Sequence, residues 1–163
     1  MFFPSAIIEW NKLDLEIRNS ENVLVFKRKI LSFIRPASNS VYGIHNALGV
    51  KYLSRLRLGL SHLREHKSKH GFLDTVNPYC NCGEDIESTI HFFLHCPIFN
   101  DIRATLFRKI RGIDNVIMNE DDSTTVQILL FGHSHYNNHT NNEILKSTIE
   151  YILESDRFSG PLF

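Results

Sequence analysis

The chain has 163 residues and is 42% hydrophobic, with twelve Phe, which suits one domain of ordinary size or one domain with an appended segment. Lys and Arg together number 18, as do Asp and Glu, and this apolar content argues against wholesale disorder. No run approaches the roughly 18 apolar residues of a membrane span. The start reaches Glu9 and Trp10 without a basic segment, unlike a signal peptide, so we expect an intracellular protein that is not secreted.

The first half of the chain predicts helices. Residues 5–19 have a mixed periodicity that fits a helix early and a strand later. Ser20 is expected to cap a helix that ends at Arg35, because the residue before a proline disfavours helical backbone. A second helical block runs to Lys69, and Gly59 is a place where it can split into two helices. Gly71 is expected to end it.

The second half predicts shorter elements around three cysteines. Ser88 is expected to cap a short helix that Pro97 ends, and a further helix is expected to run to Arg111. A polar linker at 119–123 precedes apolar stretches at 126–131 and 144–153. The fold class is therefore mainly α, with helical segments around a small irregular CCHC zinc-binding element. The expected domains are residues 1–36, residues 46–112 with basic helices and a zinc module, and residues 113–163 as a C-terminal helical tail.

All three cysteines lie in one segment, which reads C-x-C-x8-H-x4-C over Cys80, Cys82, His91 and Cys96. Three thiols and an imidazole are the ligand set of a closed tetrahedral zinc site. We therefore predict structural Zn2+ and no disulfide framework. His95 competes with His91 as the fourth ligand, and three buried thiols without a metal are the plainer alternative.

The remaining histidines form two weaker groups. His133, His135 and His139 fit a polar loop better than a second metal site, and the helical spacing of His62, His66 and His70 fits an exposed face. No phosphate-binding loop, nucleophile elbow or paired-carboxylate site is evident. We therefore expect neither enzymatic activity nor a small-molecule substrate, and no membrane partner.

The neutral net charge conceals a segregated distribution. Residues 27–70 carry ten Lys or Arg against one acid, and residues 113–163 carry eight acids against two bases. Segregated basic charge is typical of nucleic-acid contact, although solvated helix faces give the same pattern. The predicted nucleic-acid-binding residues are Lys51, Arg55, Arg57, Arg64, Lys67 and Lys69.

Three stretches, in order, resemble the region that follows the polymerase core in LINE-type (non-LTR) retrotransposon reverse transcriptases. Residues 2–13 resemble the segment after that core, 56–67 resemble its basic helix, and 77–97 resemble its C-terminal zinc-binding motif. The resemblance implies a transposable-element origin, and it implies that residues 1–36 are a thumb-like or connector-like segment that follows the polymerase core. The family's polymerase aspartates and endonuclease segment are missing, and Asp121-Asp122 follows Asn119-Glu120 instead of the family's Tyr/Phe-x sequence. We therefore expect a non-catalytic fragment.

Two functions are consistent with this sequence. In the first, the zinc element supports largely sequence-independent binding of RNA or DNA, with basic side chains on phosphates. Tyr79, Phe92 and Phe93 are then candidates for stacking on bases, although Phe92 and Phe93 also suit a core. In the second, the chain is a structural or protein-interaction module that packs on the parent polymerase core without touching nucleic acid.

Overall fold

The computed structural model describes residues 18–19, 21–22, 25, 44–72, 75 and 77–159. The chain divides into two compact units, Met1–Ala37 and Ser38–Phe163. Our expectations for residues 5–17, for the helix ending at Arg35 and for the link at 37–40 lie outside the described residues.

Two helices open the second unit. Helix α4 spans Ala47–Arg57 and begins where the Asn46 side chain accepts a hydrogen bond from the Gly49 amide. The chain then turns at Gly59, whose φ of +66° lies in the left-handed region that favours glycine. Helix α5, Arg64–Lys69, follows this turn. The predicted split at Gly59 is confirmed.

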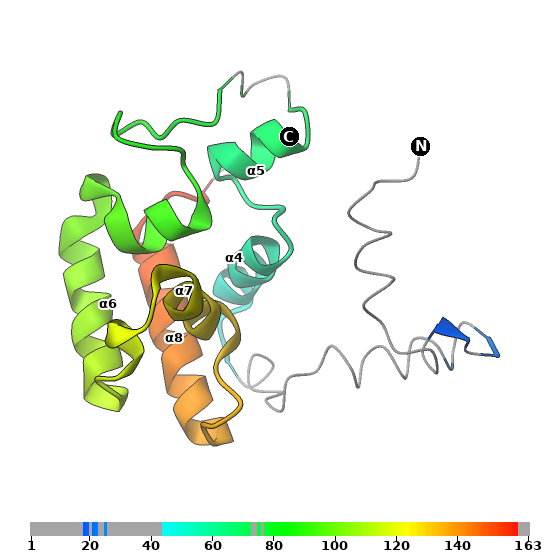
Figure 1. Ribbon diagram of the computed structural model, residues 1–163, viewed down its shortest axis with the longest axis vertical. Helices are drawn as coiled ribbons and strands as arrows, with labels where there is room; N and C mark the ends of the chain where they lie inside the picture. Colours follow the sequence, from blue (N-terminus) through cyan, green and yellow to red (C-terminus); the bar gives the residue numbers. More distant parts are fainter. Residues whose placement is uncertain are drawn as a thin grey trace. The chain divides into compact units, whose positions relative to one another are not determined.

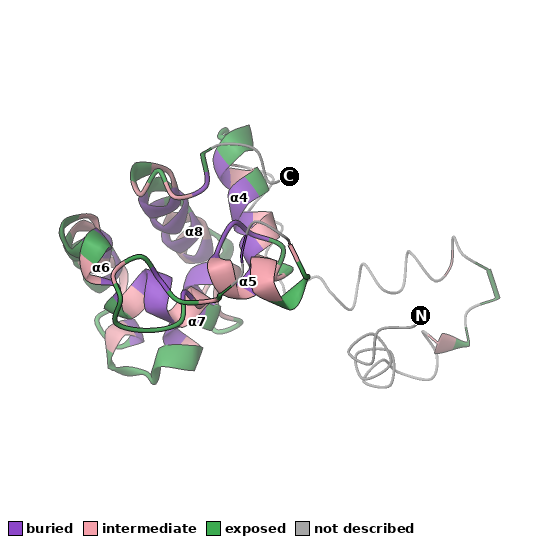
Figure 2. Cartoon of the chain, turned by 90° about the horizontal axis from the view of Figure 1, so that it is seen from above, coloured by how far each residue is buried: buried purple, intermediate pink, exposed green. Residues whose placement is uncertain are grey.

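Among the described residues of this unit, three further α-helices follow (Figure 1): α6 at Asn100–Ile113, α7 at Asp122–Phe131 and α8 at Asn138–Glu154. Helix α8 packs against α4, α6 and α7. Its buried residues include three in a row, Ser147, Thr148 and Ile149, so burial extends around much of the helix (Figure 2). The parts of the chain that the structure describes contain no strand beyond an isolated antiparallel bridge between Tyr79 and Ile86. The expected mainly helical fold is confirmed.

An aromatic cluster joins α8 to the cysteine segment. Phe92 packs edge-on against Phe93, Phe99 and Phe158, with ring centroids 4.9 to 5.2 Å apart, and lies 5.1 Å from the Tyr151 ring. The Tyr151 hydroxyl donates a 2.6 Å hydrogen bond to the Phe92 carbonyl. Burial raises the pKa of Tyr151 and keeps its hydroxyl a donor. The cysteine segment is therefore anchored in the main core.

An ion pair between half-buried Arg157 and buried Glu87 holds the end of the chain on the same segment. Arg157 donates to both carboxylate oxygens of Glu87, at 2.6 and 2.7 Å, and to the His62 carbonyl at 2.9 Å. Glu87 is 4% exposed and also accepts the backbone N–H of Arg64. Burial opposes the charge of Arg157, but the bonds to Glu87 outweigh it and raise the pKa of the guanidinium. This pair connects α5, the cysteine segment and the residues after α8.

Ser38–Phe163 forms one compact unit in which α8 packs against α4 and α6, and the expected division into 46–112 and 113–163 stays a prediction. One expectation for the second half needs correction, because residues 119–123 do more than link elements. Asp121 caps α7 by accepting the amides of Ser123 and Thr124, and Asp122 begins the helix. None of the helices in the described residues is both long and apolar enough to cross a membrane.

Replacing Arg157 with Met keeps the aliphatic stem but leaves the Glu87 carboxylate buried without its cation. We expect a loss of about 3 kcal/mol in unfolding free energy, measured by urea denaturation. The matched control is Lys109→Met, which breaks the exposed 2.5 Å pair with Glu150 and is expected to cost under about 1 kcal/mol. Equal losses for the two variants would contradict the structural role of the buried pair.

Candidate metal centre

A tight loop positions the first two cysteines. The bridge between Tyr79 and Ile86 closes it, and the Cys80 amide donates to the Asp85 carbonyl at 2.8 Å. Inside the loop the Gly83 amide donates to the Cys80 carbonyl at 3.0 Å, and Gly83 has a φ of +82°. A residue with a side chain would be strained in this left-handed backbone. The turn folds the chain back so that both thiols lie on its inner side.

A π-helical turn, His91–His95, brings the other two side chains together. The Ser88 hydroxyl accepts the His91 amide at 3.1 Å, which confirms the predicted cap. The Cys96 amide then donates to the His91 carbonyl at 2.7 Å, an i→i+5 bond. In an α-helix, five residues turn the side chain by about 500°, so His91 and Cys96 would point about 140° apart. The wider turn places them on one side and sends Phe92 and Phe93 into the core.

The four predicted ligand atoms converge. The Sγ atoms of Cys80 and Cys96 are 3.6 Å apart, Cys82 Sγ lies 3.2 Å from His91 Nε2, and all four atoms lie within 4.8 Å of one another. Bond lengths of about 2.3 Å to sulfur and 2.0–2.1 Å to nitrogen put tetrahedral ligands roughly 3.5–3.8 Å apart. Small side-chain movements therefore suffice to fit the four donors around one metal ion.

The electrostatics of the three thiols favour a cation. Burial raises the pKa of the Cys80 thiol and raises that of Cys96 to about 12, where charge on the neighbouring sulfurs adds to the shift. At Cys82 a burial effect in the same direction is outweighed by hydrogen bonds from the Glu84 backbone and the other thiols, so its pKa is lowered. Three thiolates this close repel one another, and a bound divalent ion compensates their charge.

Outer contacts hold the ligands in place. The buried Arg103 guanidinium donates to the Cys96 carbonyl at 2.8 Å and also contacts the Asn100 side chain. Glu87, between the two halves of the cluster, donates its amide to the Pro78 carbonyl at 2.8 Å while its carboxylate holds Arg157. Neither Arg103 nor Glu87 was expected from the sequence, because their partners cannot be read from local spacing.

The competing histidines lie elsewhere. His95 is exposed and its Nε2 is 2.6 Å from an oxygen of Asp122 at the start of α7. His133 and His135 contact each other in the loop before α8. The expected exposed face of His62, His66 and His70 is wrong, because His62 and His66 are buried, and His66 bonds to Ser61 at 2.8 Å. Within the described residues, Cys80, Cys82, His91 and Cys96 form the single His, Cys, Asp or Glu group able to hold a metal ion.

The predicted nucleic-acid-binding residues differ in their surroundings. Lys51 is exposed on α4 and Arg55 is half-buried. Arg57 faces α7, where it donates to the Leu130 carbonyl at 2.6 Å and lies over the Phe131 ring.

On α5, each basic side chain has a neighbour. Arg64 reaches Asn77 at 3.5 Å, Lys67 lies 5.7 Å from the Phe72 ring, and Lys69 pairs with Glu65 at 2.7 Å. Arg57 therefore contributes to packing, whereas Lys51, Arg64 and Lys69 lie at or near the surface.

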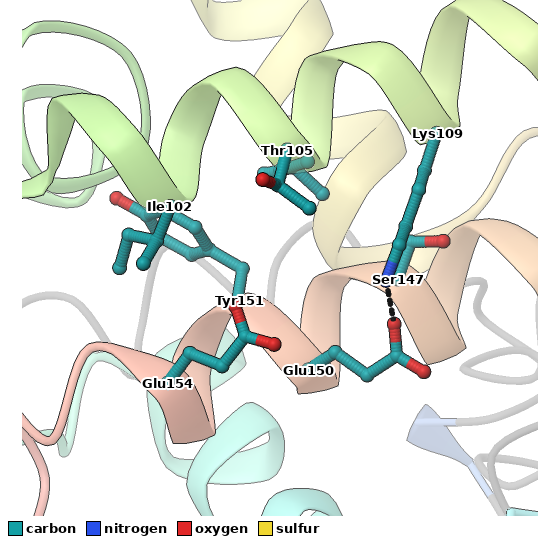
Figure 3. A pocket seen from close by; sticks show the side chains of 8 residues that line it. Ile102, Thr105, Lys109, Ser147, Glu150, Tyr151 and Glu154 are labelled. Atoms are coloured by element: carbon teal, nitrogen blue, oxygen red, sulfur yellow. Dashed lines mark hydrogen bonds and ion pairs between the residues drawn. The ribbon is translucent and has the colours of Figure 1, made fainter.

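A shallow depression between α6 and α8 offers no binding chemistry comparable to the cysteine cluster (Figure 3). It measures about 160 Å³ including space open to solvent, and the Lys109–Glu150 ion pair crosses it. Comparison of the chain with protein-family models, curated proteins and solved structures gave no match. The candidate site therefore stands on its own geometry.

The two histidines give a direct test of the ligand set. His91→Asn should lower metal affinity at least tenfold, because it removes a donor from the cluster, whereas the matched variant His95→Asn removes only an exposed contact with Asp122. Bound metal per chain is measured by titration with Co2+ or Zn2+. Metal loss in His95→Asn with retention in His91→Asn would reverse the assignment.

Proposed function

We propose that Cys80, Cys82, His91 and Cys96 bind one structural Zn2+ ion, and that the chain is a non-catalytic part of the C-terminal region of a LINE-type reverse transcriptase that binds RNA or DNA. The convergence of three thiols and one imidazole is the observation that carries the metal proposal. Soft thiolate ligands in a tetrahedral set favour zinc. Four protein donors fill such a shell and leave no position for a reactive water, which favours a structural role.

The proposed retroelement origin rests on three stretches in order, residues 2–13, 56–67 and 77–97. The last of them contains the metal cluster, and the middle one contains α4 residues, the turn at Gly59 and the first part of α5. These two stretches are packed together by Glu87, which accepts the Arg64 amide. Their proximity supports a joint role for the basic helices and the zinc element.

The proposal of nucleic-acid binding rests on the positive charge of the helices that precede the cysteine segment. Helix α5 has three Lys or Arg against one acid, Glu65, among its six residues. Lys51 and Arg55 add two charges on α4. Such contacts neutralise phosphates without reading sequence, so binding should weaken steeply as salt rises.

The alternative, a module that packs on a polymerase core, has an observation in its favour. Several large apolar side chains of the described residues are exposed, with Leu58 at 70% and Leu60 at 44% beside the turn between α4 and α5. These two leucines flank Gly59, and one compact apolar spot of this kind suits a protein contact. Loss of binding to a polymerase fragment in Leu58→Ser, with nucleic-acid binding intact, would favour this alternative.

Removal of zinc tests the metal proposal. We expect one zinc per chain, and EDTA should unfold the cysteine segment and lower the thermal midpoint of the whole unit, because metal binding contributes folding free energy. Elemental analysis and circular dichroism during chelation measure both. Protein purified without metal that keeps the thermal midpoint of the zinc-loaded form would refute the structural role.

Charge removal tests the nucleic-acid proposal. Lys51→Gln with Arg55→Gln should weaken binding of a single-stranded oligonucleotide and reduce the slope of log affinity against log salt by about 1.4, since each lost phosphate contact contributes about 0.7. The control is Lys109→Gln with Lys146→Gln, two exposed cations of α6 and α8. Identical salt slopes for both variants and the wild type would contradict the assigned surface.

A further inference from the structure

Two apolar side chains beside the cysteine cluster are exposed. Tyr79 is 56% exposed and Ile86 is 36% exposed. They pair across the antiparallel bridge that closes the cysteine loop, and residues paired in this way extend their side chains from the same face. By contrast, Phe92 and Phe93 are fully buried. Of the three aromatic residues that the sequence suggested for base stacking, only Tyr79 has an accessible ring.

The backbone beneath this pair is fixed on both sides. The Tyr79 amide donates to Asn77 Oδ1 at 3.2 Å, and the next residue, Cys80, donates to the Asp85 carbonyl at 2.8 Å. On the opposite side, Glu87 donates to the Pro78 carbonyl at 2.8 Å. A backbone fixed in this way loses little conformational freedom when a ligand binds, which favours affinity.

The charges around the pair are asymmetric. Asn77 Oδ1, which holds the Tyr79 amide, also accepts from the Arg64 guanidinium at 3.5 Å, so Arg64 lies beside Tyr79. Lys67 and Lys69 follow on the same helix, α5. Glu84 and Asp85 are exposed at the other end, in the turn of the cysteine loop. A bound anion is therefore attracted toward α5 and repelled from the turn.

We infer that Tyr79 and Ile86 form a stacking surface for an unpaired base of single-stranded nucleic acid, whose phosphates lie toward Arg64 and α5. This inference rests on the proposed nucleic-acid function and adds the strand state that it selects. A base in a duplex is already stacked on both faces, so its ring cannot reach Tyr79. An unpaired base presents a free face, and its stacking on an aromatic ring tolerates any base.

The test uses the zinc-loaded chain and fluorescence anisotropy of a labelled 12-nucleotide single strand, its duplex, and the same strand with abasic sites. Tyr79→Ala should weaken single-strand binding about 5- to 100-fold. Tyr79→Phe, which keeps the ring, should stay within about twofold of the wild type. The abasic strand should bind wild type as weakly as the normal strand binds Tyr79→Ala. Val116→Ala, which shortens a side chain that is 52% exposed, is the control and should change nothing.

The outcomes separate this inference from the proposed function. Two outcomes overturn the stacking surface and leave nucleic-acid binding intact. In the first, wild type binds in a salt-sensitive way and Tyr79→Ala binds the single strand equally well. In the second, wild type binds the duplex and the abasic strand as tightly as the normal single strand. A wild-type chain that binds none of the three probes overturns both. If Tyr79→Ala loses its metal, Tyr79→Phe and the abasic strand still decide the question. Ribose and deoxyribose versions of the strand then identify whether RNA or DNA is preferred.

Discussion

The hydrogen bond from the Tyr151 hydroxyl to the Phe92 carbonyl joins the candidate metal-binding cluster to the rest of the unit. Phe92 lies between His91 and Cys96, two of the candidate ligands, so this carbonyl belongs to the turn that orients both. The same turn sends Phe92 and Phe93 into the core, where they are fully buried against α8. The helical packing therefore fixes the position of two ligands, and ligand geometry and core packing cannot vary independently.

The i→i+5 bond from the Cys96 amide to the His91 carbonyl lets His91 and Cys96 converge while Phe92 and Phe93 stay buried. A regular helix would direct His91 and Cys96 apart, and restoring the ligands by rotation would bring the phenylalanines out of the core. π-Helical turns of this kind are frequent at functional sites, because they point side chains in directions that a regular α-helix does not allow. Arg103 stabilises the exit from the turn by binding the Cys96 carbonyl. The metal contribution to stability should thus extend through α8, although all the ligands come from residues 80–96.

Local sequence signals predicted much of this arrangement. Glycine and proline predicted the ends of α4 and of the short turn before Pro97, Ser88 was correctly predicted as a cap, and the cysteine spacing identified the four residues whose side chains converge. The sequence did not reveal the Glu87–Arg157 pair, because its members are 70 positions apart and only the folded chain brings them together. It also read Asp121 as part of a linker, since a cap and a polar loop have the same composition, and only backbone geometry distinguishes them.

The structure shows that the basic side chains of residues 27–70 are not all available to bind phosphate. Arg57 packs against α7 and contributes to the fold, whereas Lys69 stays at the surface with its charge partly compensated by Glu65. The electrostatic part of the affinity depends on how many phosphates the cations contact. A cation that packs inside the fold makes no such contact, so this part is smaller than the sequence alone would suggest. Where the electrostatic part of the affinity is small, a short-range contact that salt does not screen makes up a larger share of the total affinity. Base stacking at Tyr79 is such a contact, and it would favour unpaired strands over duplex where charge alone gives little discrimination.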